Sequence, residues 1–473
     1  MTVLSTGLSS APAAAHPDAV FTRPYVVSWN LTYRCNLACE HCYLDAGGSP
    51  RVSSEAFSDR SELDTEGCYA VIDQLAAFAP ECLTILTGGE PLLRRDILDI
   101  IRRAVSKGLW VVVGTNGVKV TASLAHLLRD AGVRGLSLSL DALDPDRHDR
   151  FRRVRGAWQN TVDGAAVLRQ AGLRFIVQTT AGAHNRGELT ALAAFACERL
   201  GASAWNLYFL VPTGRGPFVS DLTAAEYDEI LSALPLLQQT YRGRMLVNAK
   251  CAPHSIKTVL EQMSSEAAPI ADPSVQVGTD AAEKALGALR LYAGGAGGCP
   301  AGTHYLGIRP NGDVTPCPYL PLFAGSIRDK SLQDLWNSSD LFVRLRRREA
   351  LGGRCGDCEL GSRCGGCRAR AYGMTGDVMA EDPLCTHEPG RFARTPLLAV
   401  PQVEYGHVTG QTMTWNAAAE ARMQRIPVFV RGMVVRAGEE SCRSNGVSRV
   451  TLEELEKIRA RMPSAGLFGA ARR

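Results

Sequence analysis

Three cysteines lie within eight residues near the start of the chain, at Cys35, Cys39 and Cys42, and no fourth cysteine follows nearby. A structural zinc site normally closes with four protein ligands. Three thiolates can instead hold three irons of a [4Fe–4S] cluster and leave the fourth iron open to a substrate or cofactor. The C-x3-C-x2-C spacing therefore predicts an iron–sulfur cluster with one open position.

A second block of cysteines follows about 250 residues later. The stretch "CGDCELGSRCGGC" has the spacing C-x2-C-x5-C-x2-C, with single cysteines on either side of it. Paired cysteines of this kind suit either a zinc ribbon or further iron–sulfur clusters. The block contains Cys299, Cys317, Cys355, Cys358, Cys364, Cys367 and Cys385. Four other cysteines lack ligand spacing and are expected to be core or incidental thiols, namely Cys68, Cys82, Cys197 and Cys442.

These residues must be positioned by a sheet. From about residue 25 to 212, short β-rich runs such as "YVVSWNL", "CLTILTG" and "WVVVGTN" alternate with amphipathic segments. Six strand-then-helix units predict a parallel sheet with right-handed crossovers, either a full or partial barrel or an open sheet. Ligands bind at the carboxyl ends of such strands. The cysteine triplet, "TGGEP", "GTNG" and "SLD" all follow predicted strands, so we expect them at one edge.

Length, charge and hydropathy limit the classes of function that the chain can have. The chain has 473 residues and a formal charge of +4, which predicts two or three domains and no nucleic-acid partner. The densest basic run, at 344–350, is more simply a solvated helix face. No apolar run reaches the ~20 residues of a membrane span, and the N-terminus does not resemble a secretion signal. We therefore expect a cytoplasmic protein, in which the fifteen cysteines do not form structural disulfides and the clustered ones bind metal or do chemistry.

With these motifs in this order, residues 25 to 212 resemble the radical S-adenosylmethionine (SAM) superfamily, whose cysteine signature is followed by an aromatic residue, here Tyr43. The resemblance implies a partial (β/α)6 barrel. It also implies that the open iron binds SAM, that the reduced cluster cleaves it, and that the resulting radical abstracts a hydrogen atom from the substrate. Glu90 would accept the charged amino group of SAM. Further SAM contacts are implied at Gly88, Gly89, Pro91, Asn116, Ser139 and Asp141.

The second cysteine block resembles the SPASM extension, which carries auxiliary iron–sulfur clusters. By that resemblance Cys355, Cys358, Cys364 and Cys385 hold one cluster, and Cys299, Cys317 and Cys367 hold another nearer the active site. The last spacing here is x2, where many members have x3. The nearer cluster has only three evident ligands. Two alternatives stay open: Cys251 in "KCAPH" completes the ligand set, or Cys251 is a core thiol and that iron is open to substrate.

Longer strings such as "WNLYFLVPTGRG" and "CGGCRARAYGMTGD" resemble the subgroup that forms heme d1 and heme. Residues 403–465 resemble the small helical C-terminal domain found in the light-independent protochlorophyllide reductase. The expected division is a flexible N-terminus (1–22), a radical SAM core (23–245), a connecting segment (246–298), a SPASM domain (299–390) and this helical domain.

The implied function is a radical SAM oxidoreductase acting on a tetrapyrrole side chain, with flavodoxin or ferredoxin as reductant. Two alternatives stay open: a maturase for a ribosomally made peptide, and a zinc-bound scaffold without catalysis. Substrate carboxylates would pair with arginines. The candidates are Arg152, Arg153, Arg155 and Arg215, and His254 and His304 are weaker candidates for binding a substrate iron.

Overall fold

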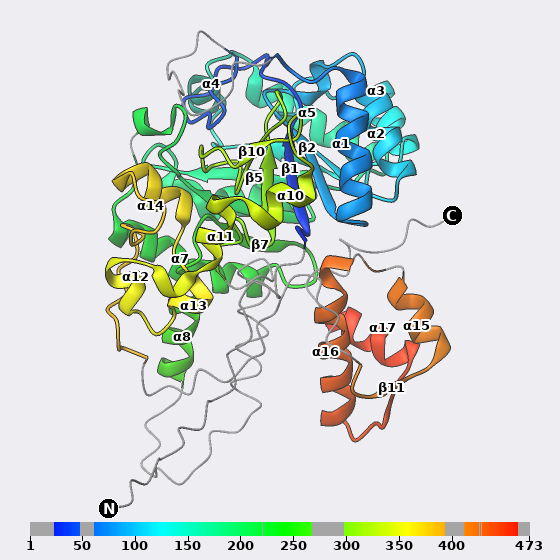
Figure 1. The fold of residues 1–473 in the computed structure, drawn as a ribbon, viewed down its shortest axis with the longest axis vertical. Coiled ribbons are helices and arrows are strands. Elements are labelled where there is room, and N and C mark those ends of the chain that lie inside the picture. Colours follow the sequence, from blue (N-terminus) through cyan, green and yellow to red (C-terminus); the bar gives the residue numbers. More distant parts are fainter. Residues whose placement is uncertain are drawn as a thin grey trace, which may run out of the picture.

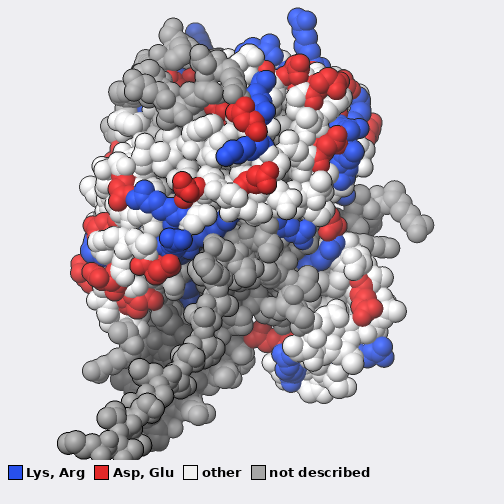
Figure 2. All heavy atoms as spheres, viewed as in Figure 1, with Lys and Arg blue, Asp and Glu red and all other residues white. Residues whose placement is uncertain are grey.

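A computed structural model describes residues 23–47, 61–219, 221–266, 298–392 and 411–461, apart from residues 425 and 427. The predicted flexible N-terminus at 1–22 lies outside these residues. No helix among those described is both long and apolar enough to cross a membrane. On the face shown in Figure 2, basic and acidic side chains are interspersed over the described surface.

One ten-stranded sheet organises the molecule. Its strand order is β10-β9-β8-β1-β2-β3-β4-β5-β6-β7, and the neighbours from β8 through β1 to β7 are all parallel. The six predicted strands are confirmed as β1 to β6, so the chain has the expected partial α/β barrel. The strands are β1 (Val26–Asn30), β2 (Leu83–Thr87), β3 (Trp110–Thr115), β4 (Leu136–Ser139), β5 (Phe175–Ala181), β6 (Ala204–Phe209), β7 (Leu246–Lys250), β8 (Tyr305–Ile308), β9 (Asp313–Thr315) and β10 (Gly325–Ser326).

Four strands extend this sheet beyond the six units. β7 pairs with β6, so the segment predicted as a connection, 246–298, begins inside the sheet. β8 pairs with β1 in parallel, and β9 and β10 continue antiparallel from it. The cysteine-rich region is therefore joined to the barrel by hydrogen bonds along β1.

Helices cover the outer face of the sheet, and their starts follow from capping residues. The side chain of Asp64 accepts the N–H of Gly67 at the start of α1, and Thr223 and Glu226 form a capping box at the start of α7. The helices of the barrel are α1 (Thr65–Phe78), α2 (Ile97–Ser106), α3 (Ala122–Asp130), α4 (Pro145–Arg152), α5 (Ala157–Gln170), α6 (Leu189–Ala194), a π-helical turn (Phe195–Leu200) and α7 (Ala224–Thr240).

The cysteine-rich region contributes short helices. In Figure 1, α12 to α14 lie on the side of the sheet that carries α7 and α8. The bounds are α8 (Ser255–Glu266), α10 (Leu332–Ser338), α11 (Asp340–Arg346), α12 (Gly353–Asp357), α13 (Gly361–Cys364) and α14 (Arg368–Thr375). Single 3₁₀ turns are Pro91–Leu93, Arg186–Glu188, Gly216–Phe218 and Arg348–Ala350.

The C-terminal module is mainly helical, as expected, with a small core around Trp415. It lies apart from the main sheet in Figure 1, and Arg431 forms an ion pair with Glu81 of the barrel at 3.1 Å. Its elements are β11 (Thr414–Trp415), α15 (Ala417–Gln424), α16 (Val428–Ser444), β12 (Arg449–Val450) and α17 (Leu452–Arg461).

Strand alternation separates an apolar outer face from a polar inner one. Alternate residues such as Val27, Val113 and Trp205 join the main core beneath the helices. Side chains of opposite parity therefore face the inside of the barrel. Those include Ser28, Asn30, Ser137, Ser139, Gln178, Asn206, Tyr208, Asn248 and Lys250. Because a barrel interior that is only a packed core is filled with branched apolar side chains, this polar face indicates a ligand chamber.

Candidate iron–sulfur centres and active site

The cysteine triplet lies in the loop after β1, at the carboxyl edge of the sheet. Backbone N–H groups approach two of its sulfurs, with Leu37 N 3.4 Å from Cys35 Sγ and Ala46 N 3.4 Å from Cys42 Sγ. Burial raises the pKa of Cys35 to about 12 and raises that of Cys39, so both would be neutral thiols without a metal. Coordination to a metal would deprotonate them. The loop thus fits a site whose charge balance is completed by a metal cluster.

The sulfur spacing distinguishes a cluster from a single metal ion. A tetrahedral zinc ion bound at about 2.3 Å would bring its thiolates to roughly 3.8 Å from one another. Among the described residues, the only set of three or more ligand atoms within 4.8 Å of one another is Cys358, Glu359 and His387. No cysteine group among these residues therefore has three thiols at the spacing of a single-ion site, and three more widely spaced thiols suit separate corners of a four-iron cluster.

The Arg152 side chain contacts both a cysteine of the triplet and a buried carboxylate. Its Nε donates to Asp141 Oδ2 at 2.7 Å and its Nη1 lies 3.5 Å from Cys39 Sγ. The Asp141 carboxylate is fully buried and also accepts the N–H of Thr180 at 2.8 Å. Burial alone would raise the pKa of Asp141, but the Arg152 charge outweighs it and holds that pKa well below its usual range. The Asp141 carboxylate therefore pairs with Arg152, and its predicted contact with SAM stays a prediction.

Arg215 is also a structural partner of the loop. Its Nε donates to Cys39 O at 2.8 Å, and its Nη1 donates to Ala46 O and Asp45 Oδ1, both at 2.9 Å. The prediction that Arg152 and Arg215 bind substrate carboxylates is therefore wrong for this structure. Both are buried and paired, and the remaining candidates, Arg153 and Arg155, are exposed.

The "GGEP" segment lies against the backbone of the cysteine loop. Gly89 N donates to Thr32 O at 2.7 Å and Glu90 N donates to Arg34 O at 2.8 Å. A Cβ at Gly89 would lie 2.3 Å from Arg34 O, and Gly88 has a φ of +146°. Glycine is required at both positions because the chains approach so closely. Pro91 then begins a 3₁₀ turn.

The Glu90 side chain connects this segment to "TNG". Its carboxylate is fully buried and accepts the Thr115 hydroxyl at 2.9 Å, Asn116 N at 2.9 Å and Leu92 N at 3.0 Å. Burial raises its pKa to about 7, although these N–H donors act in the opposite direction. The predicted contact between this carboxylate and the SAM amino group stays a prediction. Through these hydrogen bonds the Glu90 carboxylate fixes the backbone at Leu92 and Asn116.

The other predicted SAM residues converge on the same edge. Asn116 Nδ2 donates to Asn36 Oδ1 at 2.9 Å, next to Cys35. The Tyr43 hydroxyl donates to Asn30 Oδ1 at 2.7 Å at the end of β1. Ser139 ends β4 on the inner face, opposite Gln178. The structure therefore brings together the cysteine triplet, GGEP, TNG and Ser139.

One auxiliary site is a cavity within the cysteine-rich region. Four cysteines line it, together with Arg354 and His387. Backbone N–H groups lie 3.3 Å from Cys358 Sγ and 3.4 Å from Cys355 Sγ and Cys364 Sγ. This quartet is the one that the SPASM resemblance implies, namely Cys355, Cys358, Cys364 and Cys385.

A second sulfur group includes the cysteine whose role was left open. The thiols of Cys251 and Cys367 share a hydrogen bond, which raises the pKa of Cys251 and lowers that of Cys367 to about 7. Cys317 interacts electrostatically with Cys251, Cys299 and Cys367. Cys251 directly follows β7 and has a φ of +58°. All four cysteines therefore gather at one place.

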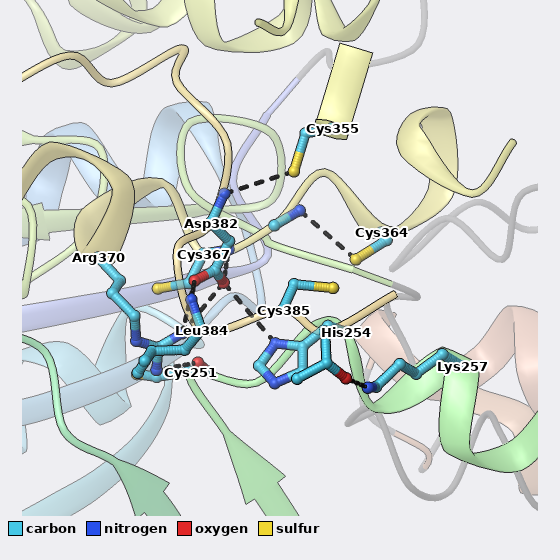
Figure 3. A network of polar contacts seen from close by, with 12 residues as sticks. Cys251, His254, Lys257, Cys355, Cys364, Cys367, Arg370, Asp382, Leu384 and Cys385 are labelled. Atoms are coloured by element: carbon cyan, nitrogen blue, oxygen red, sulfur yellow. Dashed lines mark hydrogen bonds and ion pairs between the residues drawn. The ribbon is translucent and has the colours of Figure 1, made fainter. Parts of the chain in front are cut away.

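Asp382 joins the two auxiliary sites (Figure 3). Its N–H lies 3.4 Å from Cys355 Sγ, while its carboxylate accepts Cys367 N at 2.8 Å and Arg370 Nη1 at 3.0 Å. His254 Nδ1 lies 3.7 Å from the same carboxylate, and its side chain is only 1% exposed. His254 is therefore part of this network and does not face a substrate iron.

Aromatic side chains line the chamber between the predicted SAM site and the second group of four cysteines, and the sequence analysis did not single out Tyr208 and Tyr319 among them. The Tyr319 ring, two residues after Cys317, lies 4.7 Å from Tyr43 and 6.0 Å from Tyr208. Gln178 Nε2 donates to the Tyr208 hydroxyl at 3.3 Å. An aromatic wall therefore runs from the SAM side of the chamber to the Cys251 side. Its only sequence signal was the inward parity of Tyr208 on β6.

Comparison with known families agrees with this geometry. The Radical SAM superfamily matches residues 29–196, an iron–sulfur cluster-binding SPASM domain matches 299–359, and the proto-chlorophyllide reductase 57 kD subunit family matches 415–459. The chain is 37% identical to an AdoMet-dependent heme synthase of Methanosarcina barkeri, over 79% of this chain and 99% of that protein. The chain belongs to the radical SAM superfamily, and it is an enzyme with radical SAM chemistry and a SPASM iron–sulfur domain. Its similarity to the heme synthase extends through both of those domains.

More distant relatives share the architecture. A pre-heme d1 synthase of Dinoroseobacter shibae is 31% identical over 76% of this chain and 85% of its own length. A PqqA peptide cyclase of Xanthomonas axonopodis pv. citri is 27% identical over 77% and 88%. Among solved structures, Streptococcus suis SuiB bound to S-adenosylmethionine has a TM-score of 0.58 at 16% identity, covering 78% of this chain and 79% of that one. That likeness supports the fold alone.

Proposed function

We propose that this enzyme uses SAM to abstract a hydrogen atom from a side chain of a tetrapyrrole. The observation that carries the proposal is the 37% identity along 99% of an AdoMet-dependent heme synthase. The inner face of the barrel supports it, because Tyr43, Tyr208 and Tyr319 offer aromatic surface to a flat conjugated ligand.

In this proposal Cys35, Cys39 and Cys42 bind a [4Fe–4S] cluster whose fourth iron takes SAM. When bound, the cluster and SAM supply a 5′-deoxyadenosyl radical. The chain's own residues position these groups: Glu90 fixes the backbone of GGEP and TNG, while Arg152 and Arg215 fix the cysteine loop. Backbone polar groups of Gly88, Gly89 and Pro91, with the Asn116 and Ser139 side chains and Tyr43, surround the place where SAM would bind.

We further propose two auxiliary [4Fe–4S] clusters. Cys355, Cys358, Cys364 and Cys385 would bind one. Cys251, Cys299, Cys317 and Cys367 would bind the other, so that its irons are all ligated by the protein. When bound, these clusters would supply electron-transfer chemistry beside the chamber, and Asp382 contacts both ligand sets. Flavodoxin or ferredoxin is the proposed source of electrons for SAM cleavage.

A peptide-modifying maturase is the second candidate, supported by the similarity to PqqA peptide cyclase. The zinc scaffold is disfavoured because the chain belongs to the radical SAM superfamily and is similar to a heme synthase along most of its length. The deciding experiment measures 5′-deoxyadenosine formed by anaerobically reconstituted, reduced protein with and without iron-coproporphyrin III. Stimulation above the uncoupled rate is expected. An unchanged rate would remove the tetrapyrrole proposal and direct the search to peptides.

A further inference from the structure

Lys250 is the last residue of β7 and lies on the inner face of the barrel. Val247 and Ala249 of the same strand join the apolar core beneath the helices. Asn248 points the opposite way, since its Nδ2 donates to Asn206 Oδ1 of the neighbouring strand at 3.0 Å. Lys250 has the parity of Asn248, so its side chain projects into the chamber.

Its neighbour across the strands is an aromatic residue of the chamber wall. Lys250 is in register with Tyr208 on β6, and the Tyr208 ring contacts Tyr319. Lys250 also precedes Cys251, whose carbonyl accepts Arg370 Nη2 at 2.7 Å. The ammonium group is therefore placed beside the aromatic wall and near the second group of four cysteines.

Several buried cations around this edge have carboxylate partners. Arg152 pairs with Asp141, Arg215 with Asp45 and Arg370 with Asp382. Lys257, seven residues after Lys250, pairs with Asp228 at 2.6 Å. By contrast, no carboxylate among the residues that the structure describes pairs with Lys250, which is half-buried. Removing an ammonium group from water is costly without a partner. A cluster bound through Cys251 would offset part of this cost, and a Lys250 that faces the chamber without a carboxylate partner can in addition pair with an anionic ligand.

We propose that Lys250 binds a carboxylate of the substrate and thereby orients it between the SAM site and the auxiliary cluster. The inference rests on the proposed function, which supplies a planar macrocycle bearing carboxylate side chains. The ring would lie against Tyr208 and Tyr319, and one carboxylate would pair with the ammonium group on the adjacent strand. SAM itself is not the ligand in question, because its predicted contacts lie on β2 to β4, while Lys250 lies on β7 beyond β5 and β6.

The test is a binding titration of the full-length, anaerobically reconstituted protein, followed through the porphyrin absorption band. Lys250→Met removes the charge and keeps the length of the side chain. Lys250→Gln is a second neutral variant, Lys250→Arg restores a cation, and Lys330→Met changes an exposed lysine on another part of the surface. The probes are iron-coproporphyrin III and its tetramethyl ester in the same detergent solution. Iron content and uncoupled SAM cleavage report whether each variant is intact.

The neutral variants are expected to bind the free acid roughly 10- to 100-fold more weakly, as the loss of a charge-assisted hydrogen bond predicts. They should bind the ester as the wild type does, and Lys250→Arg and Lys330→Met should stay within a few-fold of the wild type. An intact Lys250→Met or Lys250→Gln protein with unchanged affinity for the acid would overturn the role of Lys250 and leave the proposed function standing. A wild-type protein that binds neither porphyrin would overturn both.

Discussion

The Nη1 atom of Arg152 lies 3.5 Å from the Sγ of Cys39, while the other edge of the same guanidinium group pairs with Asp141. A buried carboxylate thus fixes a cation beside one ligand of the SAM-binding cluster. Hydrogen bonds and charge near cluster sulfurs set reduction potentials. We therefore expect the pair to tune a cluster bound to these cysteines as well as to hold their loop.

Replacing Arg152 with Met should make the cluster harder to reduce, because the positive charge that stabilises its reduced form is removed. A lost charged hydrogen bond predicts a midpoint potential lower by roughly 60 mV, one tenfold step of a one-electron couple. The measurement is an EPR-monitored redox titration of the signal that changes on SAM addition. Arg153→Met, which alters the exposed neighbouring arginine, is the control. Equal potentials in the two variants would show that Arg152 has no electrostatic role.

Glu90→Gln should change how stability depends on pH. Burial raises the Glu90 pKa from 4.5 to about 7 in the folded chain. Between pH 4.5 and pH 7 the unfolded chain loses a proton that the folded chain keeps. The contribution of Glu90 to the free energy of unfolding is therefore largest below pH 4.5 and is lost as the pH rises to 7. By proton linkage, the free energy of unfolding changes by about 3 kcal/mol at most over this interval.

The measurement is anaerobic denaturant unfolding of the wild type and Glu90→Gln between pH 4.5 and 7. The stability of the variant relative to the wild type should rise across this interval. Glu66→Gln, at an exposed position of α1, should not change the slope. A parallel pH dependence for wild type and Glu90→Gln is the result that this interpretation does not permit.

Cys251→Ala should open one iron of the second auxiliary cluster. The remaining cysteines would leave a coordination position that an added small thiol could fill, and iron content should fall by no more than about four per chain. The measurement is the EPR spectrum of the reduced protein with and without the added thiol, compared with Cys197→Ala. SAM is present throughout, so that it occupies the open iron of the first cluster. If the wild type then still responds to the thiol as Cys251→Ala does, Cys251 is not a ligand.

Glu439→Ala should loosen the C-terminal module alone. The side chain of Glu439 is buried and accepts Thr412 N at 2.8 Å, Met413 N at 3.1 Å and Trp415 Nε1 at 3.2 Å. Leaving these donors unpaired should lower the free energy of unfolding of the C-terminal module by roughly 1–3 kcal/mol. Hydrogen exchange over residues 412–458 should accelerate, whereas Glu453→Ala, with a side chain 78% exposed, should have little effect. Faster exchange across the barrel as well would argue against an independent module.

The sequence was sufficient for the strands and the cysteine groups because those features are local. β1 to β6 are continuous β-rich runs, and ligand spacing is visible within a few residues. The roles of buried charges were not predictable in this way. Arg152 lies 113 residues from Cys39 and Arg215 lies 170 from Asp45, so their pairing depends on how the loops pack.

The roles of Glu90 and Cys251 also depend on contacts between residues that are distant in the sequence. A motif places Glu90 near SAM, but only its burial and its three kinds of donor show that the carboxylate faces Thr115 and Asn116. Cys251 precedes its partner Cys367 by more than one hundred residues, and β7 must join the sheet before the two thiols can meet.

The most direct test of hydrogen abstraction from a tetrapyrrole uses iron-coproporphyrin III deuterated on its propionate side chains. Reduced, cluster-loaded protein is incubated anaerobically with SAM and this porphyrin, and the 5′-deoxyadenosine formed is analysed by mass spectrometry. Transfer of deuterium to 5′-deoxyadenosine, at a rate above that without porphyrin, is the predicted result. Unlabelled 5′-deoxyadenosine formed at the unstimulated rate would contradict it.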